Sequence, residues 1–292
     1  MNDTLYLSDL DGTLLRSDQT LSAYTCAVID RLVSAGVHFS YATARSIETA
    51  EKVTRGIRVA LPVIVQNGTF IVDSATKKPL WSAKFTPAEA ERIFEAFLRR
   101  GLFPIIYAVI DGRNRFSYLR DRCTGPQWEF LLTRIGGSDR RAREIFSEED
   151  ALDGDLHYFA CISDDEGALL SVKEALEGGF RCIFSRDIYT GAPWLEVMPK
   201  SASKAAAARR LQKMLGCNKL VCFGDAVNDL PMFELADECY AVTNAAPELK
   251  VIATDVIGGN DEDAVAGWLE KNKLIKKPAP QAAPWAQAAL FW

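Results

Sequence analysis

The chain has 292 residues, 48% of them hydrophobic and 25% charged, an ordinary globular composition that suits two α/β domains or one domain with a large insertion. A formal net charge of −5 excludes the basic footprint of a nucleic-acid-binding protein, so phosphorylated substrates would need local positive charge inside a cleft. No stretch approaches the roughly 20 apolar residues of a membrane helix, and no basic segment precedes a long apolar run at the N-terminus, so we expect no membrane partner and no signal peptide.

The seven cysteines are scattered, odd in number and without CxxC spacing. Most stand in apolar runs, as buried free thiols do, and this favours a reducing cytoplasm. The two histidines, His38 and His157, lie inside strand-like runs, where we expect packed rather than catalytic side chains. Because no Cys/His cluster occurs, we expect no zinc site.

Strand and helix patterns alternate along the first part of the chain. Ser22 and Gly36 are the residue types of a helix N-cap and of a helix end, and the strands are near-continuous apolar runs. This βαβαβ alternation predicts a parallel sheet covered by helices on both faces. The expected elements are strands at 5–7, 37–42 and 62–66, helices at 23–35 and 47–54, and a hairpin strand at 70–72.

The pattern of alternating strands and helices changes near residue 83. Thr86 and Glu89 have the spacing of a capping box, which predicts a helix that begins there. Two strand-like runs joined across Asp111-Gly112 predict a hairpin. The expected later elements are strands at 102–110, 115–119, 156–163 and 180–186 and helices at 128–135 and 166–176.

After residue 189 the alternation of strands and helices seen in the first part of the chain resumes. The expected elements are strands at 194–198, 220–223, 239–242 and 256–257 and helices at 204–215, after Pro247, and at 262–270. We therefore expect a Rossmann-like parallel-sheet core made of residues 1–82 and 190–272, with an α/β domain inserted at 83–189. The Pro/Ala-rich tail at 273–292 is expected to be loose.

The first strand is followed directly by Asp9, Asp11, Gly12 and Thr13. Open α/β sheets bind ligands at the carboxyl ends of their strands, and residues i and i+2 of a strand share a face. Two such carboxylates can hold a divalent cation or can differ enough in pKa to divide acid and base roles. Gly12 permits a sharp turn whose N–H groups can bind an anion.

Taken alone, an Asp-x-Asp at a strand end usually belongs to a turn or a helix cap, and Gly12 comes too early for a calcium loop. Three further signals follow: Thr43-x-Arg45, Lys204, and the GDAVND segment at 224–229. Each has an ordinary explanation by itself, as a helix cap or a solvated lysine. Together they indicate one site, because each falls where a parallel sheet gathers its loops.

In this order the motifs resemble those of the haloacid dehalogenase-like (HAD) superfamily, in particular its Cof-like phosphatases with a large α/β cap. That family has DxDGT, then Thr-Gly-Arg, a cap insertion, a lysine and GDxxND. The same order and spacing cover nearly the whole chain apart from the tail, and the phrase EVMPKSASK resembles the approach to the family's lysine. Ala44 departs from the family's usual glycine, which changes local turn geometry but removes no chemical group.

The resemblance implies a Mg²⁺-dependent phosphatase of small phosphate monoesters, such as sugar phosphates or related metabolites. Asp9 would attack phosphorus and form an aspartyl-phosphate. Asp11 would protonate the leaving alkoxide and then deprotonate the water that breaks the intermediate. The Asp9 carboxylate, the Asp11 backbone carbonyl and Asp225 would hold Mg²⁺, with Asp229 as an orienting or additional metal-site acid.

The remaining site residues implied by the resemblance act on the phosphoryl group or the substrate. Thr43 would donate a hydrogen bond to the phosphoryl oxygens, and Lys204 would neutralise their charge. Asn228 would contact the phosphate or the Lys204 side. Arg45 and Asn67 are candidates for the substrate face.

Two other functions remain open at this stage: a phosphomutase of the same superfamily and a non-catalytic phosphosugar-binding module. The first would isomerise its substrate without releasing phosphate, and the second would fit better if Asp9 or Lys204 were replaced, which neither is. A dinucleotide oxidoreductase and a P-loop kinase are disfavoured because neither GxGxxG after a strand nor GxxxxGK[ST] occurs. The expected partner is a small phosphorylated metabolite, and the chain is compatible with a monomer or a homodimer.

Overall fold

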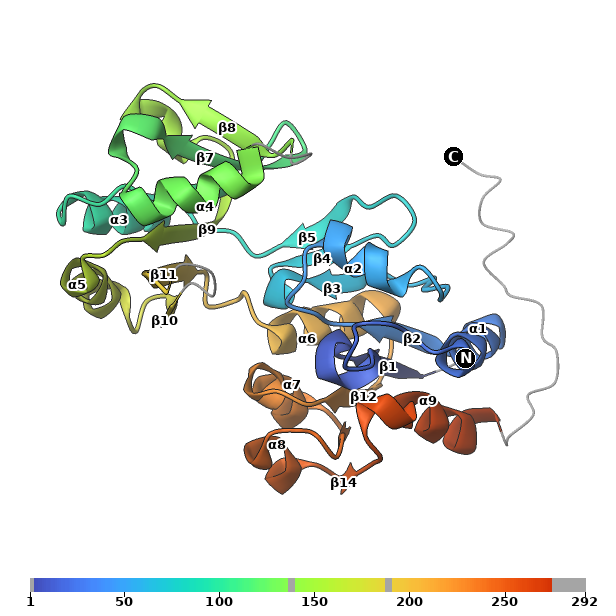
Figure 1. Ribbon diagram of the computed structural model, residues 1–292. Coiled ribbons are helices and arrows are strands. Elements are labelled where there is room, and N and C mark those ends of the chain that lie inside the picture. Colours follow the sequence, from blue (N-terminus) through green and yellow to red (C-terminus); the bar gives the residue numbers. More distant parts are fainter. Residues whose placement is uncertain (1–2, 136–139, 187–190, 275–292) are drawn as a thin grey trace, which may run out of the picture. The chain divides into compact units, whose positions relative to one another are not determined.

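The computed structural model describes residues 3–135, 140–186 and 191–274 (Figure 1). These described residues form two compact units, the first with residues from 3–63, 73–77 and 208–274 and the second with residues from 64–72 and 78–207. The segment 83–189, expected as an inserted domain, lies in the second unit, and its exact limits stay a prediction. The predicted tail falls outside the described residues from position 275 onward.

The first unit is built on a five-stranded parallel sheet, as the alternation of strands and helices predicts (Figure 1). The strand order is β14-β13-β12-β1-β2, which puts the apolar first strand inside the sheet, between β12 and β2. Its residues Leu5 and Leu7 are completely buried. The strands are β1 (Thr4–Ser8), β2 (His38–Tyr41), β12 (Lys219–Gly224), β13 (Glu238–Ala241) and β14 (Asp255–Val256).

Helices cover this sheet where the periodic patterns predict them. Ser22 caps the first helix, since its hydroxyl accepts a hydrogen bond from the Thr25 N–H at 3.0 Å. In α9 the Trp268 ring packs against Phe223 and Tyr240 of the sheet, with ring centroids 5.2 and 4.3 Å away. The helices are α1 (Ala23–Ser34), α2 (Ile47–Thr54), α6 (Lys204–Leu215), whose first four residues belong to the second unit, α7 (Leu230–Leu235), α8 (Pro247–Ile252) and α9 (Ala264–Leu269).

The strand predicted at 62–66 belongs to a different sheet. We expected residues 62–66 in the parallel sheet, but β3 (Val63–Val65) is hydrogen-bonded in a three-stranded sheet with β4 (Phe70–Val72) and β5 (Pro79–Ser82). The reason is the turn after β3. Gln66, Asn67 and Gly68 all have positive φ, at 50°, 53° and 90°, and this left-handed run sends the chain straight back into β4.

The second unit contains a six-stranded sheet of order β10-β11-β9-β6-β7-β8. The hairpin predicted across Asp111-Gly112 is present, and both turn residues have positive φ, 50° and 70°, as a two-residue hairpin loop requires. Strand β8 was not predicted from the sequence. The strand expected at 194–198 in the parallel-sheet core lies in this sheet instead, where it forms β11 and pairs antiparallel with β9 and β10. The strands are β6 (Ile105–Ile110), β7 (Arg113–Leu119), β8 (Ala142–Ile145), β9 (Asp155–Ile162), β10 (Arg181–Arg186) and β11 (Pro193–Met198).

Helices pack on both faces of the six-stranded sheet. Helices α3 (Pro87–Leu98) and α5 (Glu166–Leu176) share one core with Phe159 and Leu195, and α4 (Gly125–Ile135) packs through Leu131 on the other face. The predicted capping box begins α3: the Thr86 N–H donates to the Glu89 carboxylate at 2.8 Å, and the Glu89 N–H donates to the Thr86 hydroxyl at 3.3 Å.

The cysteines and histidines pack against neighbouring side chains or lie in the interior to different degrees. All seven cysteines are free thiols. His157 is fully buried with its ring edge against Phe70, and the His38 ring lies 3.2 Å from the Cys217 sulfur. No helix in the described ranges has the length and apolarity needed to cross a membrane.

Candidate active site

Two neighbouring strands of the parallel sheet each end in an aspartate. Asp9 follows β1 and Asp225 follows β12, and these strands pair with Ser8 opposite Phe223. Asp9 is only 5% exposed, its N–H donates to the Phe223 carbonyl at 2.9 Å, and its Oδ1 accepts from the Leu10 N–H at 2.7 Å. These two bonds fix both the backbone and the carboxylate of Asp9.

A third aspartate shapes the turn after β12. Asp229 is completely buried, and its Oδ2 accepts hydrogen bonds from the Asp225 and Ala226 N–H groups, both at 3.2 Å. Gly224 leaves room for this carboxylate, because a Cβ at position 224 would lie 2.8 Å from the Asp229 Oδ2. Asp229 therefore holds the turn that presents Asp225.

The three acids form a group that could bind a metal ion. Asp9, Asp225 and Asp229 each offer one carboxylate oxygen, and these atoms all lie within 4.8 Å of one another. Hard oxygen donors of this kind suit Mg²⁺, and a divalent cation would offset the repulsion between the acids. The donor set therefore fits the cation that the sequence predicts, although which oxygens would bind it, including the Asp11 carbonyl, stays a prediction.

Gly12 is required by its position beside Asp225. It has φ of 72°, and a Cβ there would lie 2.3 Å from the Asp225 Oδ2, so the carboxylate would have to move. The other Asp225 oxygen accepts from the Thr13 hydroxyl at 2.8 Å, and the Asn244 amide donates to the Gly12 carbonyl at 2.7 Å. The turn after Asp9 is thus locked to the turn after β12.

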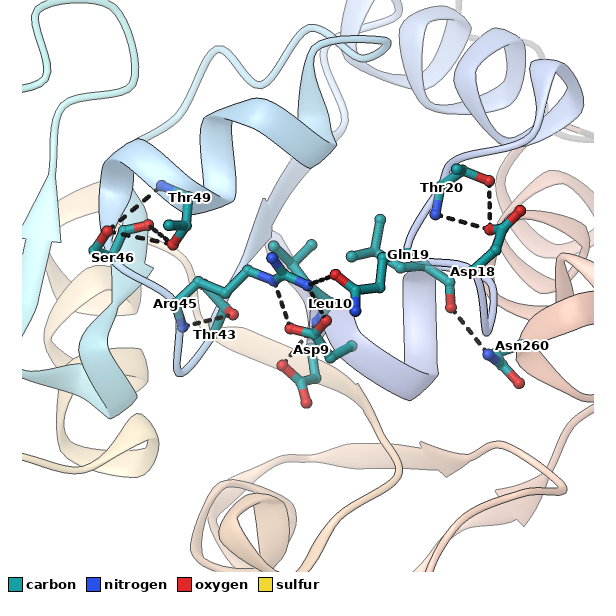
Figure 2. Close-up of polar contacts among 12 residues, drawn as sticks. Asp9, Leu10, Asp18, Gln19, Thr20, Thr43, Arg45, Ser46, Thr49 and Asn260 are labelled. Carbon is teal, nitrogen blue, oxygen red and sulfur yellow. Dashed lines mark hydrogen bonds and ion pairs between the residues drawn. The ribbon is translucent and has the colours of Figure 1, made fainter. Parts of the chain in front are cut away.

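Asp11 points to an arginine. The Arg45 guanidinium donates to both Asp11 oxygens, from Nε at 2.8 Å and from Nη2. Nη2 also donates to the Gln19 side chain at 2.9 Å (Figure 2). The hydrogen bond to Asp11 raises the pKa of Arg45, whereas partial burial opposes the shift. The Arg45 side chain is 19% exposed and that of Asp11 46%, so this ion pair sits at the edge of the site.

Thr43 lies at the turn that delivers Arg45. It is completely buried, and its hydroxyl oxygen accepts a hydrogen bond from the Arg45 N–H at 3.1 Å (Figure 2). Asn228 lies in the helical turn Val227–Asp229, directly before the buried Asp229.

Lys204 and Asn67 belong to the second unit. Lys204 is the first residue of α6 and is 2% exposed. Asn67 lies in the left-handed turn after β3, and this turn touches the start of α6: a Cβ on Gly68 would lie 2.1 Å from the Ser203 oxygen and 2.7 Å from the Lys204 nitrogen. The structure therefore brings the turn of Asn67 against the backbone of Lys204.

Several residues that contact the predicted site residues or their turns were not assigned a role from the sequence. They are Thr13, Gln19, Gly68, Gly224 and Asn244. Thr13 and Gly224 are part of the motifs that begin at Asp9 and at Gly224, so the sequence marks both positions. Their contacts with Asp225 and Asp229 are visible only in the structure. Gln19 lies outside the motifs and carries no sequence signal for its contact with Arg45.

The fold and the site define an α/β protein with a carboxylate centre at the ends of parallel strands. The model of the haloacid dehalogenase-like hydrolase family matches residues 6–269, so the chain belongs to this family. The assignment made from the motifs is thereby confirmed.

Relatives and solved structures agree with the family. The chain is 27% identical over 282 residues to 5-amino-6-(5-phospho-D-ribitylamino)uracil phosphatase YwtE of Bacillus subtilis, covering 90% of this chain and 96% of the relative. It is 28% identical over 267 residues to HMP-PP phosphatase of Cronobacter sakazakii, covering 89% and 92%. The fold resembles that of a haloacid dehalogenase-like hydrolase from Bacteroides thetaiotaomicron, with TM-score 0.66, 21% identity and coverage of 92% and 98%. A Thermotoga maritima protein gives TM-score 0.71, 22% identity and coverage of 93% and 97%.

Proposed function

We propose that this chain is a Mg²⁺-dependent phosphatase that hydrolyses small phosphate monoesters through a phosphoryl group carried on Asp9. The observation that carries the proposal is the gathering of Asp9, Asp225 and Asp229 at the ends of two neighbouring strands in a member of this hydrolase family. Relatives named as phosphatases support the same reaction class.

In the proposed first step an Asp9 oxygen forms a bond to phosphorus while the bond from phosphorus to the ester oxygen breaks. The fixed backbone and rotamer of Asp9 favour this attack, because the nucleophile needs no reorientation. Asp11 gives its proton to the departing alkoxide. In the second step Asp11 takes a proton from water, the water oxygen attacks phosphorus, and Asp9 is released with inorganic phosphate.

The other residues would bind the metal ion, offset the charge of the phosphoryl group or contact the substrate. Asp9, Asp225 and Asp229, with the Asp11 carbonyl, would hold Mg²⁺, which supplies charge stabilisation at the phosphoryl oxygens when bound. Thr43 donates to a phosphoryl oxygen, and Lys204 offsets phosphoryl charge, with Asn228 beside them. Because Asp11 must carry a proton to act as the acid, its ion pair with Arg45 separates when substrate binds, and Arg45 and Asn67 then face the substrate.

The substrate class is proposed from the relatives. One is named for a phosphorylated ribitylaminouracil and another for HMP-PP, both small phosphorylated metabolites. We propose a sugar phosphate or a related metabolite for this chain, and a panel of phosphorylated metabolites with Mg²⁺, assayed for phosphate release, would identify it. Isomerisation without release of phosphate would instead assign a phosphomutase.

The decisive experiment separates the two acids of the first motif. Asp9→Asn removes the nucleophile and should abolish phosphoenzyme formation. Asp11→Asn retains the nucleophile, so with an activated aryl phosphate it should still load Asp9 and then stall, because general acid–base help is worth about 10²–10⁴-fold. Rapid quench and mass spectrometry should find the phosphoryl group on Asp9.

Two results would contradict this mechanism. One is label on a residue other than Asp9 in the Asp11→Asn protein. The other is steady turnover by Asp9→Asn after deamidation back to aspartate has been excluded by mass.

A further inference from the structure

A partly buried arginine of the second unit lies against the segment that precedes Lys204. Arg181, the first residue of β10, donates from Nη1 to the Ala202 carbonyl at 2.7 Å. Ala202 is completely buried and packs with Ala83 and Met198. A charged donor therefore holds a main-chain carbonyl two residues before Lys204.

A second partly buried polar group accompanies this arginine. The Glu196 carboxylate, on β11, accepts a hydrogen bond from the Tyr158 hydroxyl. Burial lowers the pKa of Arg181 and raises that of Glu196, and the attraction between the two charges opposes both shifts. Keeping such groups away from water costs free energy, and none of them takes part in the chemistry proposed above.

The backbone at the start of α6 is held on another side by Gly68. Because the position of its missing Cβ is 2.1 Å from the Ser203 oxygen, the turn after β3 touches this segment directly. Ser203 in turn caps the helix, its hydroxyl accepting from the Ala206 N–H at 3.1 Å. Residues 202–204 are thus fixed by Arg181, by the Gly68 turn and by the helix cap.

We propose that Arg181 is a positioning residue that sets the backbone from which the Lys204 side chain departs. The inference rests on the proposed function, in which Lys204 offsets phosphoryl charge. A guanidinium suits this task because its planar donors keep one orientation toward a carbonyl, and Glu196, itself held by Tyr158, supplies the compensating charge.

The test compares Arg181→Met, Lys204→Met and the double variant. A matched control is Arg186→Met, which makes the same change at the exposed end of the same strand, where Arg186 pairs with Glu166. Misplacement of a catalytic group by about 1 Å can cost 10²-fold. Accordingly, Arg181→Met should lower kcat/KM about 10–100-fold, equally for an aryl phosphate and an alkyl phosphate, because the charge of Lys204 acts on the phosphoryl group common to both.

The double variant distinguishes positioning from general damage. If Arg181 acts through Lys204, adding Arg181→Met to Lys204→Met should cause no further loss. Orthovanadate binding, measured by calorimetry with Mg²⁺ present, should follow the same non-additive pattern and does not depend on turnover. Arg181→Lys, which keeps a donor near Ala202, should recover part of the activity.

Four outcomes would overturn the inference. Additive losses in turnover and in vanadate binding would make Arg181 an ordinary stabilising residue. A loss confined to one leaving group would make it a specificity residue. If Lys204→Met is inactive but Arg181→Met is as active as the control Arg186→Met, Arg181 does not position Lys204, and the proposed function stands. Full activity of Lys204→Met would instead remove the role of Lys204, on which both the inference and the proposed function depend.

Discussion

At the scale of single residues, Gly12 couples the backbone to the candidate metal site. Gly12→Ala would place a methyl group 2.3 Å from the Asp225 Oδ2 and would strain a left-handed residue, so the Asp225 carboxylate must move. Losing the support of a metal ligand typically costs 10–100-fold in metal affinity. We therefore expect the Mg²⁺ concentration for half-maximal activity to rise by at least about 10-fold.

Gly36→Ala is the matched control for this prediction. Gly36 has φ of 80°, yet among the described residues no atom beyond its two chain neighbours lies within 4 Å of the position its Cβ would take. Both variants pay the same backbone strain of about 1–2 kcal/mol, but only one displaces a carboxylate. An equal shift in Mg²⁺ requirement for both variants would show that the close contact with Asp225 is irrelevant.

At the scale of elements, the turn at Leu10–Leu14 depends on loops from the other end of the chain. The Asn244 amide donates to the Gly12 carbonyl, and the Asn260 amide donates to the Leu15 carbonyl at 3.0 Å. Asn244→Ala removes one of these braces, and a hydrogen bond is worth about 0.5–1.5 kcal/mol, which corresponds to roughly 2- to 10-fold. We expect kcat/KM to fall by about that factor, in steady-state assays at saturating Mg²⁺.

Asn218→Ala provides the comparison, since Asn218 is exposed and lies between α6 and β12 rather than beside the site. Its activity should equal that of the unaltered protein. Equal losses in Asn218→Ala and Asn244→Ala would refute the bracing role of Asn244.

Most helices and strands could be predicted because their signals are local. The expected limits of α2, α5 and α6 coincide with the observed ones, since caps and apolar periodicity lie within each segment. The same holds for the acids of the site. Asp9 and Asp225 each directly follow an apolar strand, and parallel strands bring their ends together whatever the details of the loops.

What the sequence does not predict is pairing between distant segments. The sheet to which β3 belongs depends on three successive left-handed residues, two of which are not glycine, and such conformations carry no reliable sequence signal. The bond from Thr13 to Asp225 joins residues 212 positions apart. The ion pair of Arg45 with Asp11 likewise depends on the course of two loops, so the pattern predicted both residues but not their contact.

At the scale of the whole molecule, the two units should respond to different solution conditions. The candidate metal ligands Asp9, Asp225 and Asp229 all lie in the first unit. A ligand that binds only the folded state stabilises it by about 2.7 kcal/mol at 100 times its Kd. We therefore expect Mg²⁺ to raise the unfolding midpoint and a chelator to reverse the shift and abolish activity, as scanning calorimetry and phosphate release would record.

Asp225→Asn should remove this Mg²⁺-dependent shift, even if the loss of one acid from the cluster makes the metal-free protein more stable. Glu91→Gln, an equal change of charge at an exposed position of α3, should retain the shift. Turnover in excess chelator, with trace metal excluded by analysis, would contradict the assignment of the three acids.

The second unit should instead be sensitive to acid, because it buries His157. Burial lowers the pKa of this imidazole from 6.5 to about 4, and its Nε2 has no hydrogen-bond partner among the described residues. Unfolded chains bind the proton near pH 6.5, whereas the folded protein binds it only near pH 4. Between these values the unfolded state holds more protons, so stability falls as the pH is lowered, by roughly 3 kcal/mol across the window.

His157→Gln cannot take up a proton in this range, so its free energy of unfolding should vary less between pH 6.5 and pH 4, whatever its stability at pH 7. Denaturant titrations at several pH values would measure the slope, with hydrogen exchange in β9 reporting on the second unit alone. His38→Gln is the natural comparison: burial also lowers the pKa of His38, but this histidine lies in the first unit and is not fully buried. Replacing it should therefore leave the acid sensitivity of β9 intact. If His157→Gln retained the full pH dependence while His38→Gln lost it, the acid-labile group would lie in the first unit rather than in the second.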